Sequence, residues 1–204
     1  NPKNKGDDLD KILAQLKDKV AKFFSKGPKS FLAGFIVLLG LWLMSGFYTI
    51  SPEEQGVVLR FGKYVSISSP GLNYHIPTPV EKVIKVPVTT TRNVEIGFRS
   101  QNASSIRNVD EESLMLTGDE NIVDINFVVQ WFVSDAAKYV FNIRNPDKNI
   151  KDSAESVMRE VIGKTDIDFA LAEGRDQVRQ EAQESLQTIL DRNESGITVS
   201  SLLL

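Results

Sequence analysis

The sequence predicts an α+β fold that follows a single N-terminal transmembrane helix, and three patterns along its 204 residues support this prediction. No charged residue occurs between Ser30 and Pro52, which is typical of a helix that spans a membrane. Short segments rich in β-branched residues follow, separated by turns with Gly and Pro. After Asn145 the apolar residues recur with helical spacing, and strands followed by helices are characteristic of α+β domains.

The composition excludes several classes of function. The 24 Lys and Arg residues are outnumbered by 27 Asp and Glu residues, so no surplus of positive charge exists for a polynucleotide, and we expect no nucleic-acid partner. The chain has no Cys and a single His, His75, which excludes thiolate zinc sites, iron–sulfur clusters, disulfides and metal centres with a His pair. We therefore expect no bound metal ion, no cofactor and no catalytic residue.

Residues 1–29 are predicted to form a basic amphipathic tail on the cytoplasmic side of the membrane. Apolar residues recur at helical spacing from Leu9 to Phe24, and Gly27-Pro28 ends this pattern. The tail has eight lysines and four aspartates, a net charge of +4, whereas the chain after Ile50 has 16 cations and 23 anions, a net charge of −7. Positively charged flanks stay in the cytoplasm, so the main domain is expected on the outer side of the membrane, which in a Gram-negative cell is the periplasm. The tail helix would lie on the anionic leaflet, and a partner-binding or merely solvated helix is the alternative.

Residues 30–50 are predicted to be the transmembrane helix. The apolar run of 20 residues that starts at Phe31 would be about 30 Å long as a helix, which matches the hydrocarbon core of a bilayer. A buried core helix would have an amphipathic stripe, and a cleaved signal peptide would have a shorter apolar run and a small-x-small cleavage site. The side chains expected inside the membrane are Phe31, Leu32, Phe35, Ile36, Val37, Leu38, Leu39, Leu41, Trp42, Leu43 and Phe47.

Residues 51–204 are predicted to form the α+β domain, either as one unit or as two subdomains of about 51–113 and 114–204. Residues 56–62 and 80–88 have the pattern of strands, and Pro87 favours a strand end or an edge position because it lacks an N–H donor.

The middle of this domain is predicted to contain a loop and a hairpin. Residues 97–112 are polar and rich in turn formers, which predicts a mobile loop. Apolar residues alternate from Asn121 to Val133, so we expect one long strand there, joined by a turn to a short strand over residues 114–117.

The last third of the chain is predicted to contain two helices and a strand. Asn145-Pro146 is a helix-start signal, and the apolar stripe that follows continues to Ile162. A second amphipathic helix is expected over residues 175–192, and a final strand over residues 197–204.

Four separated stretches resemble a known family. The sequence Glu54-Gln55-Gly56-Val57-Val58-Leu59-Arg60-Phe61-Gly62-Lys63, followed by Pro70-Gly71-Leu72-Asn73, is similar to the start of the SPFH (band 7-like) domain of stomatins, prohibitins, flotillins and the bacterial HflK and HflC proteins. Residues 45–50, 115–123 and 159–164 with 173–175 resemble the HflK family in particular.

The resemblance implies a function that the composition alone does not indicate. Proteins of the HflK type are inner-membrane proteins with a periplasmic SPFH domain, and they form a large hetero-oligomer with an HflC-like SPFH protein. That assembly encloses and regulates the AAA+ protease FtsH, and a coiled coil that would follow Leu204 closes it. The resemblance therefore implies a membrane-anchored scaffold, not an enzyme, whose partners are membrane lipid, an HflC-like protein and an FtsH-type protease.

Two other functions remain open at this point. A stomatin-like organiser of membrane lipid domains would need no protease partner. A membrane-bound peptidase would need a serine activated by His75 or by a lysine, but no Gly-x-Ser-x-Gly motif occurs. The acidic pairs Glu111-Glu112 and Asp119-Glu120 could suggest a divalent cation, but adjacent carboxylates usually point into water, and we interpret both pairs as solvated.

Two surfaces are candidates for contacts outside the chain. Leu72, Tyr74 and Ile76 alternate near the end of the predicted membrane segment, so this strand end is a candidate for the outer membrane interface, with ordinary core as the alternative. Candidates for lateral contacts between subunits are the faces of the amphipathic helices and the residues Asn142, Arg144, Asp147 and Lys148.

Overall fold

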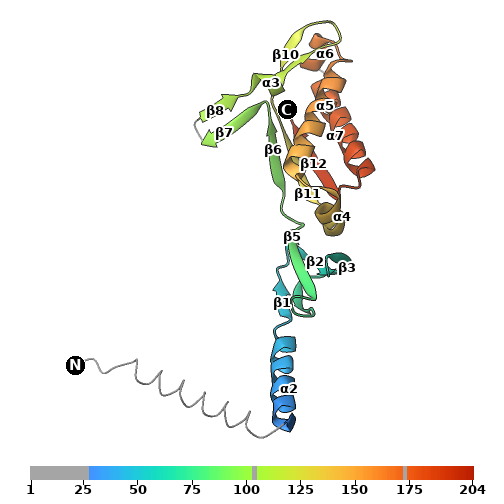
Figure 1. The fold of residues 1–204 in the computed structure, drawn as a ribbon. Coiled ribbons are helices and arrows are strands. Elements are labelled where there is room, and N and C mark those ends of the chain that lie inside the picture. Colours follow the sequence, from blue (N-terminus) through green and yellow to red (C-terminus); the bar gives the residue numbers. More distant parts are fainter. Residues whose placement is uncertain (1–27, 103–104, 172–173) are drawn as a thin grey trace, which may run out of the picture.

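The structure is a computed structural model of the chain, and it describes residues 28–102, 105–171 and 174–204. The tail helix predicted within residues 1–29 lies almost entirely outside the described residues. Figure 1 shows helix α2 at one end, a small β-subdomain beside it, and a larger subdomain of strands and helices at the far end. We call residues 47–87 the proximal subdomain and residues 92–204 the distal subdomain.

Helix α2 (Pro28–Met44) is shorter than the predicted membrane helix. It has 17 residues, and the hydrogen bonds from Ser45 N–H to Trp42 O and from Gly46 N–H to Leu43 O, both 3.2 Å, close its last turn. The apolar residues that follow form strand β1 (Phe47–Ile50) because they pair with β4 (Gly71–Tyr74). Within the described residues, no helix has both the length and the apolarity required to cross a bilayer.

The proximal subdomain is built from two small antiparallel sheets. Strand β1 pairs with β4, and a three-stranded sheet has the order β3-β2-β5. The strands predicted over 56–62 and 80–88 are present, and Pro87 is the last residue of its strand, as its missing N–H predicts. The three-stranded sheet consists of β2 (Glu54–Arg60), β3 (Lys63–Ser68) and β5 (Glu81–Pro87).

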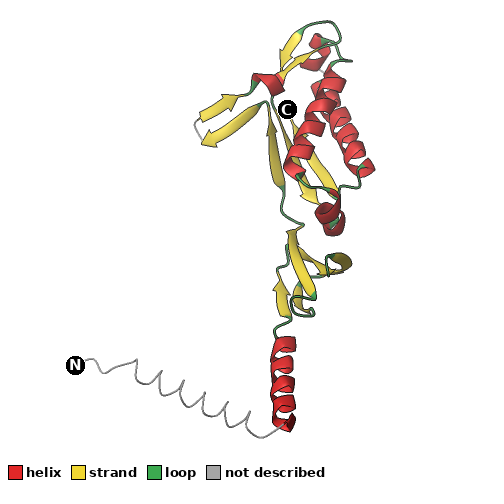
Figure 2. Ribbon diagram, viewed as in Figure 1, coloured by secondary structure: helices red, strands yellow, loops and turns green. Residues whose placement is uncertain are grey.

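A three-stranded antiparallel sheet with the order β12-β11-β6 lies at the centre of the distal subdomain, and helices α5 and α7 pack against it (Figure 2). The predicted start of α5 at Pro146 and the predicted bounds of α7 are confirmed. The α+β class is likewise confirmed. The strands are β6 (Arg92–Ile96), β11 (Phe127–Val133) and β12 (Ile197–Leu203), and the helices are α4 (Ala136–Asn142), α5 (Pro146–Ile162), α6 (Ile167–Leu171) and α7 (Arg175–Arg192).

The predicted mobile loop over residues 97–112 is wrong, because this segment forms regular structure. Strands β7 (Phe98–Asn102) and β8 (Ser105–Asn108) pair in a hairpin, and helix α3 (Asp110–Ser113) follows. The hairpin projects from the side of the distal subdomain (Figure 1).

The predicted hairpin after α3 is confirmed, but its second strand is interrupted. Strand β9 (Leu114–Leu116) pairs with β10 (Ile122–Asp124), and the chain then leaves this pairing before β11 begins at Phe127. The break occurs because Ile125 N–H donates to Ser113 O at 2.9 Å, which directs the two halves into different sheets.

The hydrophobic core is centred on β11 and the helices that cover it. Because β6 pairs with β11, residues 92–96 share a sheet with the C-terminal half of the chain. Alternate β11 residues are buried, as the apolar pattern from 121 to 133 predicts. The largest fully buried side chains are those of Trp131, Phe127, Ile96, Ile150, Met158, Ile162, Leu186, Leu190, Ile197, Leu202, Val57 and Val129.

One free edge of the distal sheet is protected by a side chain. Gln187 of α7 accepts a hydrogen bond from Val199 N–H at 2.8 Å and donates one to Ile197 O at 3.2 Å. Its amide thus occupies the position that another strand would take beside β12, and natural sheets commonly protect edges from unwanted pairing.

Candidate functional site

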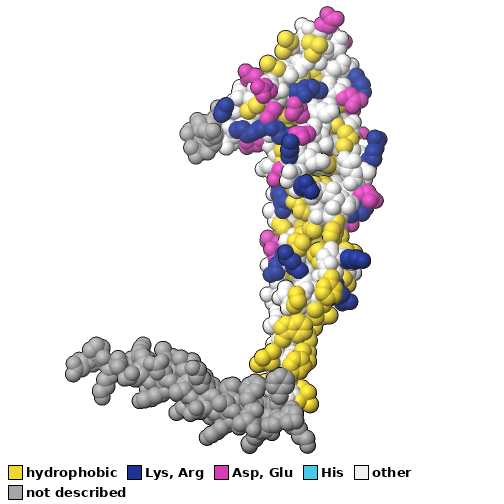
Figure 3. Space-filling model, in the orientation of Figure 1, with side chains coloured by type: hydrophobic (Ala, Val, Ile, Leu, Met, Phe, Trp, Pro, Cys, Tyr) yellow, Lys and Arg dark blue, Asp and Glu magenta, His cyan; other side chains and the backbone are white. Residues whose placement is uncertain are grey.

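The apolar side chains of α2 form a continuous exposed surface at one end of the molecule (Figure 3). Eight of the predicted membrane residues on α2, together with Phe47, have exposed fractions between 40% and 68%. Phe31 lies in α2, but its side chain is outside the described part of the chain. A surface of this kind requires a covering partner or a lipid phase. The exposed residues are Leu32, Phe35, Ile36, Val37, Leu38, Leu39, Leu41, Leu43 and Phe47.

Two of the three predicted interface residues extend this apolar surface onto the proximal subdomain. Leu72 is 71% exposed and Tyr74 is 49% exposed, both on β4. Phe47 and Tyr74 are opposite each other in the β1–β4 register, and their ring centroids are 5.2 Å apart. Ile76 is instead partly buried, beyond the end of β4.

A set of hydrogen bonds joins α2 to the proximal subdomain. The indole Nε1 of Trp42 donates to Thr78 O at 3.1 Å, and His75 N–H donates to Gly46 O at 3.0 Å. Among the predicted membrane residues whose side chains the structure describes, Trp42 therefore differs in being only partly exposed and in having a polar partner outside α2.

Glu81 holds in place the loop that contains Thr78, whose carbonyl accepts the hydrogen bond from Trp42. Its carboxylate is buried, accepts Ile76 N–H at 2.7 Å, and forms an ion pair with Arg60 at 2.7 Å. The hydrogen bond from Ile76 N–H lowers the pKa of Glu81 and is the largest effect; burial opposes it, and the hydrogen bond and charge of Arg60 lower the pKa further. The loop between β4 and β5 is thus held by a carboxylate that is charged at neutral pH.

In the part of the chain that the structure describes, no serine hydroxyl is hydrogen-bonded to His75, so no Ser–His pair is formed there. The ring Nδ1 of His75 lies 2.8 Å from Ile76 O, and because a carbonyl only accepts, Nδ1 is the donor. On its other side the ring packs against Tyr48, with centroids 5.1 Å apart. Among the described residues, no group of three or more His, Asp or Glu side chains is placed to hold a metal ion.

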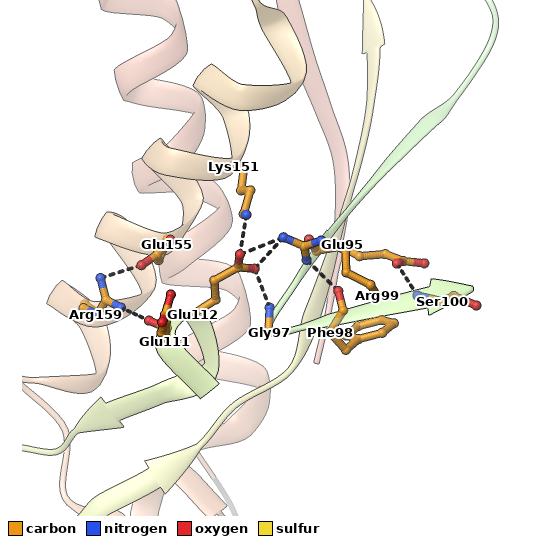
Figure 4. A network of polar contacts seen from close by, with 10 residues as sticks. All are labelled: Glu95, Gly97, Phe98, Arg99, Ser100, Glu111, Glu112, Lys151, Glu155 and Arg159. Atoms are coloured by element: carbon orange, nitrogen blue, oxygen red, sulfur yellow. Dashed lines mark hydrogen bonds and ion pairs between the residues drawn. The ribbon is translucent and has the colours of Figure 1, made fainter. Parts of the chain in front are cut away.

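Glu112 is the centre of a polar network in the distal subdomain (Figure 4). Its carboxylate accepts hydrogen bonds from Arg99 Nη2 at 2.7 and 2.9 Å and from Gly97 N–H at 3.3 Å, and it also pairs with Lys151 Nζ. Arg99 belongs to β7 and Lys151 to α5, so one carboxylate joins the hairpin, α3 and the helix layer.

This network corrects the interpretation of the acidic pair Glu111-Glu112 as solvated. The Glu112 side chain is only 13% exposed, whereas Glu111 is exposed, and the main-chain oxygen of Glu111 accepts Arg159 Nη2 at 2.9 Å. Burial alone would raise the pKa of Glu112, but the hydrogen bonds from Lys151, Arg99 and Gly97 hold it below its ordinary value of 4.5. Lys151 is 39 residues away in sequence, so no local pattern around Glu112 could have indicated the network.

Replacing Glu112 with Gln is expected to destabilise the chain by about 2 kcal/mol at pH 7. Removing one partner of a fully buried ion pair costs roughly 3–5 kcal/mol. The smaller figure applies because the side chains of Arg99 and Lys151 are 38% and 25% exposed, and solvent screens them. Urea unfolding in detergent, followed by tryptophan fluorescence, measures the difference.

The pH dependence gives this prediction a second test. A lowered pKa means that the charged carboxylate stabilises the fold above pH 4.5 and that this stabilisation is lost as the pH falls through the lowered value. The difference in the free energy of unfolding between wild type and Glu112→Gln should therefore disappear as the pH falls below 4.5. Glu111→Gln is the matched control and should unfold like the wild type. If this difference instead grew in acid, the charged Glu112 carboxylate would not be the stabilising form.

Two of the four predicted lateral residues, Asp147 and Lys148, lie near this network, and the other two lie elsewhere. Asp147 and Lys148 line an open groove of about 690 Å³ between β6 and the start of α5, together with Arg92 and Arg99. Asn142 donates to Glu194 O at 2.8 Å, which connects α4 to the turn before β12, and Arg144 is exposed. The structure thus brings two of the four candidates together.

Comparison with known proteins identifies similar chains. The SPFH domain / Band 7 family matches residues 48–204. Protein HflK of Vibrio parahaemolyticus is 34% identical over 204 residues, which cover 94% of this chain and 47% of the relative. Protein HflK of Treponema pallidum is 39% identical over 175 residues, covering 83% of this chain and 52% of the relative. The protein named modulator of FtsH protease HflK of Escherichia coli K12 is 34% identical over 181 residues, covering 86% of this chain and 39% of the relative. The chain therefore spans about half the length of these relatives or less.

Proposed function

The chain belongs to the SPFH domain / Band 7 family, and from this premise we propose that it is a membrane-anchored scaffold that regulates an FtsH-type protease. The observation that carries the proposal is the match to an E. coli protein named as a modulator of FtsH protease. This match covers 86% of the chain at 34% identity. A modulator acts on another enzyme, so the same similarity favours a regulator over a peptidase.

The anchor in this proposal is α2, which forms the helical part of the predicted segment 30–50, in a bacterial inner membrane, with the N-terminus in the cytoplasm and the SPFH domain in the periplasm. At about 1.5 Å per residue, the 17 residues of α2 extend about 25 Å, somewhat less than a hydrocarbon core of about 30 Å. The exposed side chains of Phe47, Leu72 and Tyr74 continue the apolar surface past the helix. We propose that they rest in the outer interface, where Tyr74 can place its ring in lipid and its hydroxyl in water.

Regulation in this proposal comes from geometry. Each subunit is fixed at the bilayer, so neighbouring copies and an HflC-like SPFH protein meet at high effective concentration, and weak lateral contacts suffice for assembly. A closed assembly around the protease would restrict which membrane proteins reach it. The alternative is a stomatin-like organiser of lipid domains, which would use the same anchor and the same lateral contacts without a protease.

Purification from native membranes in a mild detergent tests the proposal. We expect a large particle that contains the chain, an HflC-like SPFH protein and an FtsH-type protease. Leu38→Arg/Leu41→Arg should be lost from carbonate-washed membranes, because each arginine at a helix centre costs about 2.5–3.5 kcal/mol. Leu38→Ile/Leu41→Ile is the matched control and should stay in the membrane. A large particle without a protease would instead support the lipid organiser, and wild type released by carbonate would overturn both.

A further inference from the structure

The turn between β2 and β3 holds a bulky residue in a backbone conformation that suits it poorly. Phe61 and Gly62 form this two-residue turn, with φ angles of +50° and +82°. Positive φ at both positions favours Asn-Gly, because large side chains rarely adopt it. Packing does not compensate, since Phe61 is 77% exposed, the largest fraction among the exposed large apolar residues that the structure describes. Strained residues cluster at functional sites, which makes this turn a candidate for one.

Phe61 lies close to the end of the membrane helix. Its N–H donates to Val80 O at 3.0 Å, and Val80 is two residues from Thr78. The carbonyl of Thr78 in turn accepts the indole of Trp42, in the last turn of α2, at 3.1 Å. Because two residues span at most about 7 Å, one short loop contacts both the Phe61 turn and the end of α2.

Two cations close the hairpin beside Phe61. Arg60 and Lys63 lie directly opposite each other in the β2–β3 register, where like charges repel. Arg60 Nε and Nη2 both donate to one carboxylate oxygen of Glu81, and the other oxygen accepts Ile76 N–H. Lys63 is exposed and has no ion pair within the described residues. One of the two positive charges is thus left without a counter-ion.

The charges around the turn do not supply that counter-ion. The proximal subdomain has four cations and three acidic residues, and two of these acids, Glu53 and Glu54, lie where β2 begins, roughly 20 Å along the strand from Arg60. The third acid is Glu81, which is already paired. Helix α4 packs against β2 and β3 and contains a lysine but no acid. Figure 3 shows Lys and Arg side chains bordering the apolar surface that continues from α2.

We propose, on the basis of the membrane anchor above, that this turn binds an anionic phospholipid of the outer leaflet. Phe61 enters the acyl-chain region, and Lys63, with Arg60 beside it, binds the headgroup phosphate. A hydrocarbon core of about 30 Å extends past the end of α2 toward this turn, and long cationic side chains reach from such a depth to the phosphates. Phosphatidylglycerol has the required net charge, whereas the choline group of phosphatidylcholine would repel the lysine.

Electron paramagnetic resonance of spin-labelled lipids tests this preference with the full chain in phosphatidylcholine bilayers. Wild type should associate more strongly with labelled phosphatidylglycerol than with labelled phosphatidylcholine. Lys63→Gln should reduce this preference roughly fivefold, the effect of one cation near a membrane surface, and Lys63→Arg should keep it. Lys148→Gln, which removes an exposed cation of the distal subdomain, is the control and should behave like the wild type. The lysines of the N-terminal tail are the same in all these chains, so the differences report on the turn.

The role of Phe61 has a separate test, because asparagine suits the turn better than phenylalanine does. Phe61→Asn should unfold at the same urea concentration as the wild type or at a higher one. The chain has no cysteine of its own, so a bimane label can be placed on Phe61→Cys. Nitroxide-labelled lipid chains should quench this label and should not quench one on Arg192→Cys in the distal subdomain. A clear loss of stability in Phe61→Asn would mean that the ring supports the fold and would overturn its assignment to lipid.

The remaining outcomes separate this site from the proposed function. An equal lipid preference in wild type and Lys63→Gln, or a Phe61 label that lipid nitroxides do not quench, would overturn the site and leave the membrane scaffold intact. Release of the wild type by carbonate would overturn both. Loss of the Lys63-dependent preference on adding glycerol 1-phosphate would show that the site takes a free phosphate. A label that is shielded in the particle purified from native membranes, but not in lipid bilayers, would show that a protein covers Phe61 instead.

Discussion

Replacing Gly97 with alanine is expected to destabilise the distal subdomain by about 3 kcal/mol, the sum of a backbone cost and a steric cost. Gly97 has a φ of +88°, in the region that side chains with a Cβ rarely adopt, and this contributes about 1–2 kcal/mol. A Cβ would also lie 2.3 Å from Asn126 Oδ1 and 3.1 Å from the main-chain oxygen of Ile125. Overpacking of this kind costs about 1–3 kcal/mol.

The backbone at Gly97 cannot easily move to relieve this overlap. Its N–H donates to Glu112 at 3.3 Å, and its carbonyl accepts Val109 N–H at 2.8 Å, so a shift would disturb both the polar network and the hairpin. Urea unfolding, followed by the fluorescence of the buried Trp131, measures the loss. Gly62→Ala is the control, because Gly62 has a φ of +82° but no atom within 4 Å of the added Cβ, so only the backbone cost remains. Equal losses in the two variants would contradict the steric contribution.

The elements that could be predicted from sequence are those whose signals are local. The bounds of α7 follow from an apolar spacing that repeats over five turns, and the start of α5 follows from Asn145-Pro146. Helix α4 was missed although its signal was present, since Asp135 is a capping residue and accepts hydrogen bonds from Ala137 N–H and Lys138 N–H.

The errors occur where a distant partner decides the structure. Apolarity alone continues to Ile50, so nothing local shows that the helix ends at Met44 and that β1 then pairs with β4. The polar segment over 97–112 folds because Arg99 and Lys151 both bind Glu112. The candidate site divides in the same way between local and distant signals. Leu72 and Tyr74 are exposed, as their alternation along the chain suggests. The interpretation of Glu112 as solvated is wrong because both of its cationic partners lie on other elements.

A second large effect is expected at Gly46, where α2 passes into the proximal subdomain. A Cβ there would lie 2.1 Å from the main-chain oxygen of His75 and 2.8 Å from the Tyr74 ring. A main-chain atom cannot turn away as a side chain can, so Gly46→Ala should break the hydrogen bond from His75 N–H to Gly46 O and separate β1 from β4. We expect a local cost of about 3 kcal/mol, which increases the open population roughly 100-fold.

Limited proteolysis measures this local opening. Cleavage within residues 47–50 and 71–80 should accelerate by about the same factor when opening is fast relative to cleavage, while the unfolding of the distal subdomain should not change. Gly40→Ala is the control, because Gly40 lies within α2 and an added Cβ has no atom within 4 Å. It should be neutral or should stabilise α2 by about 0.5–1 kcal/mol. Equal cleavage of the two variants would mean that Gly46 and the bond from Trp42 to Thr78 do not fix the helix to the domain.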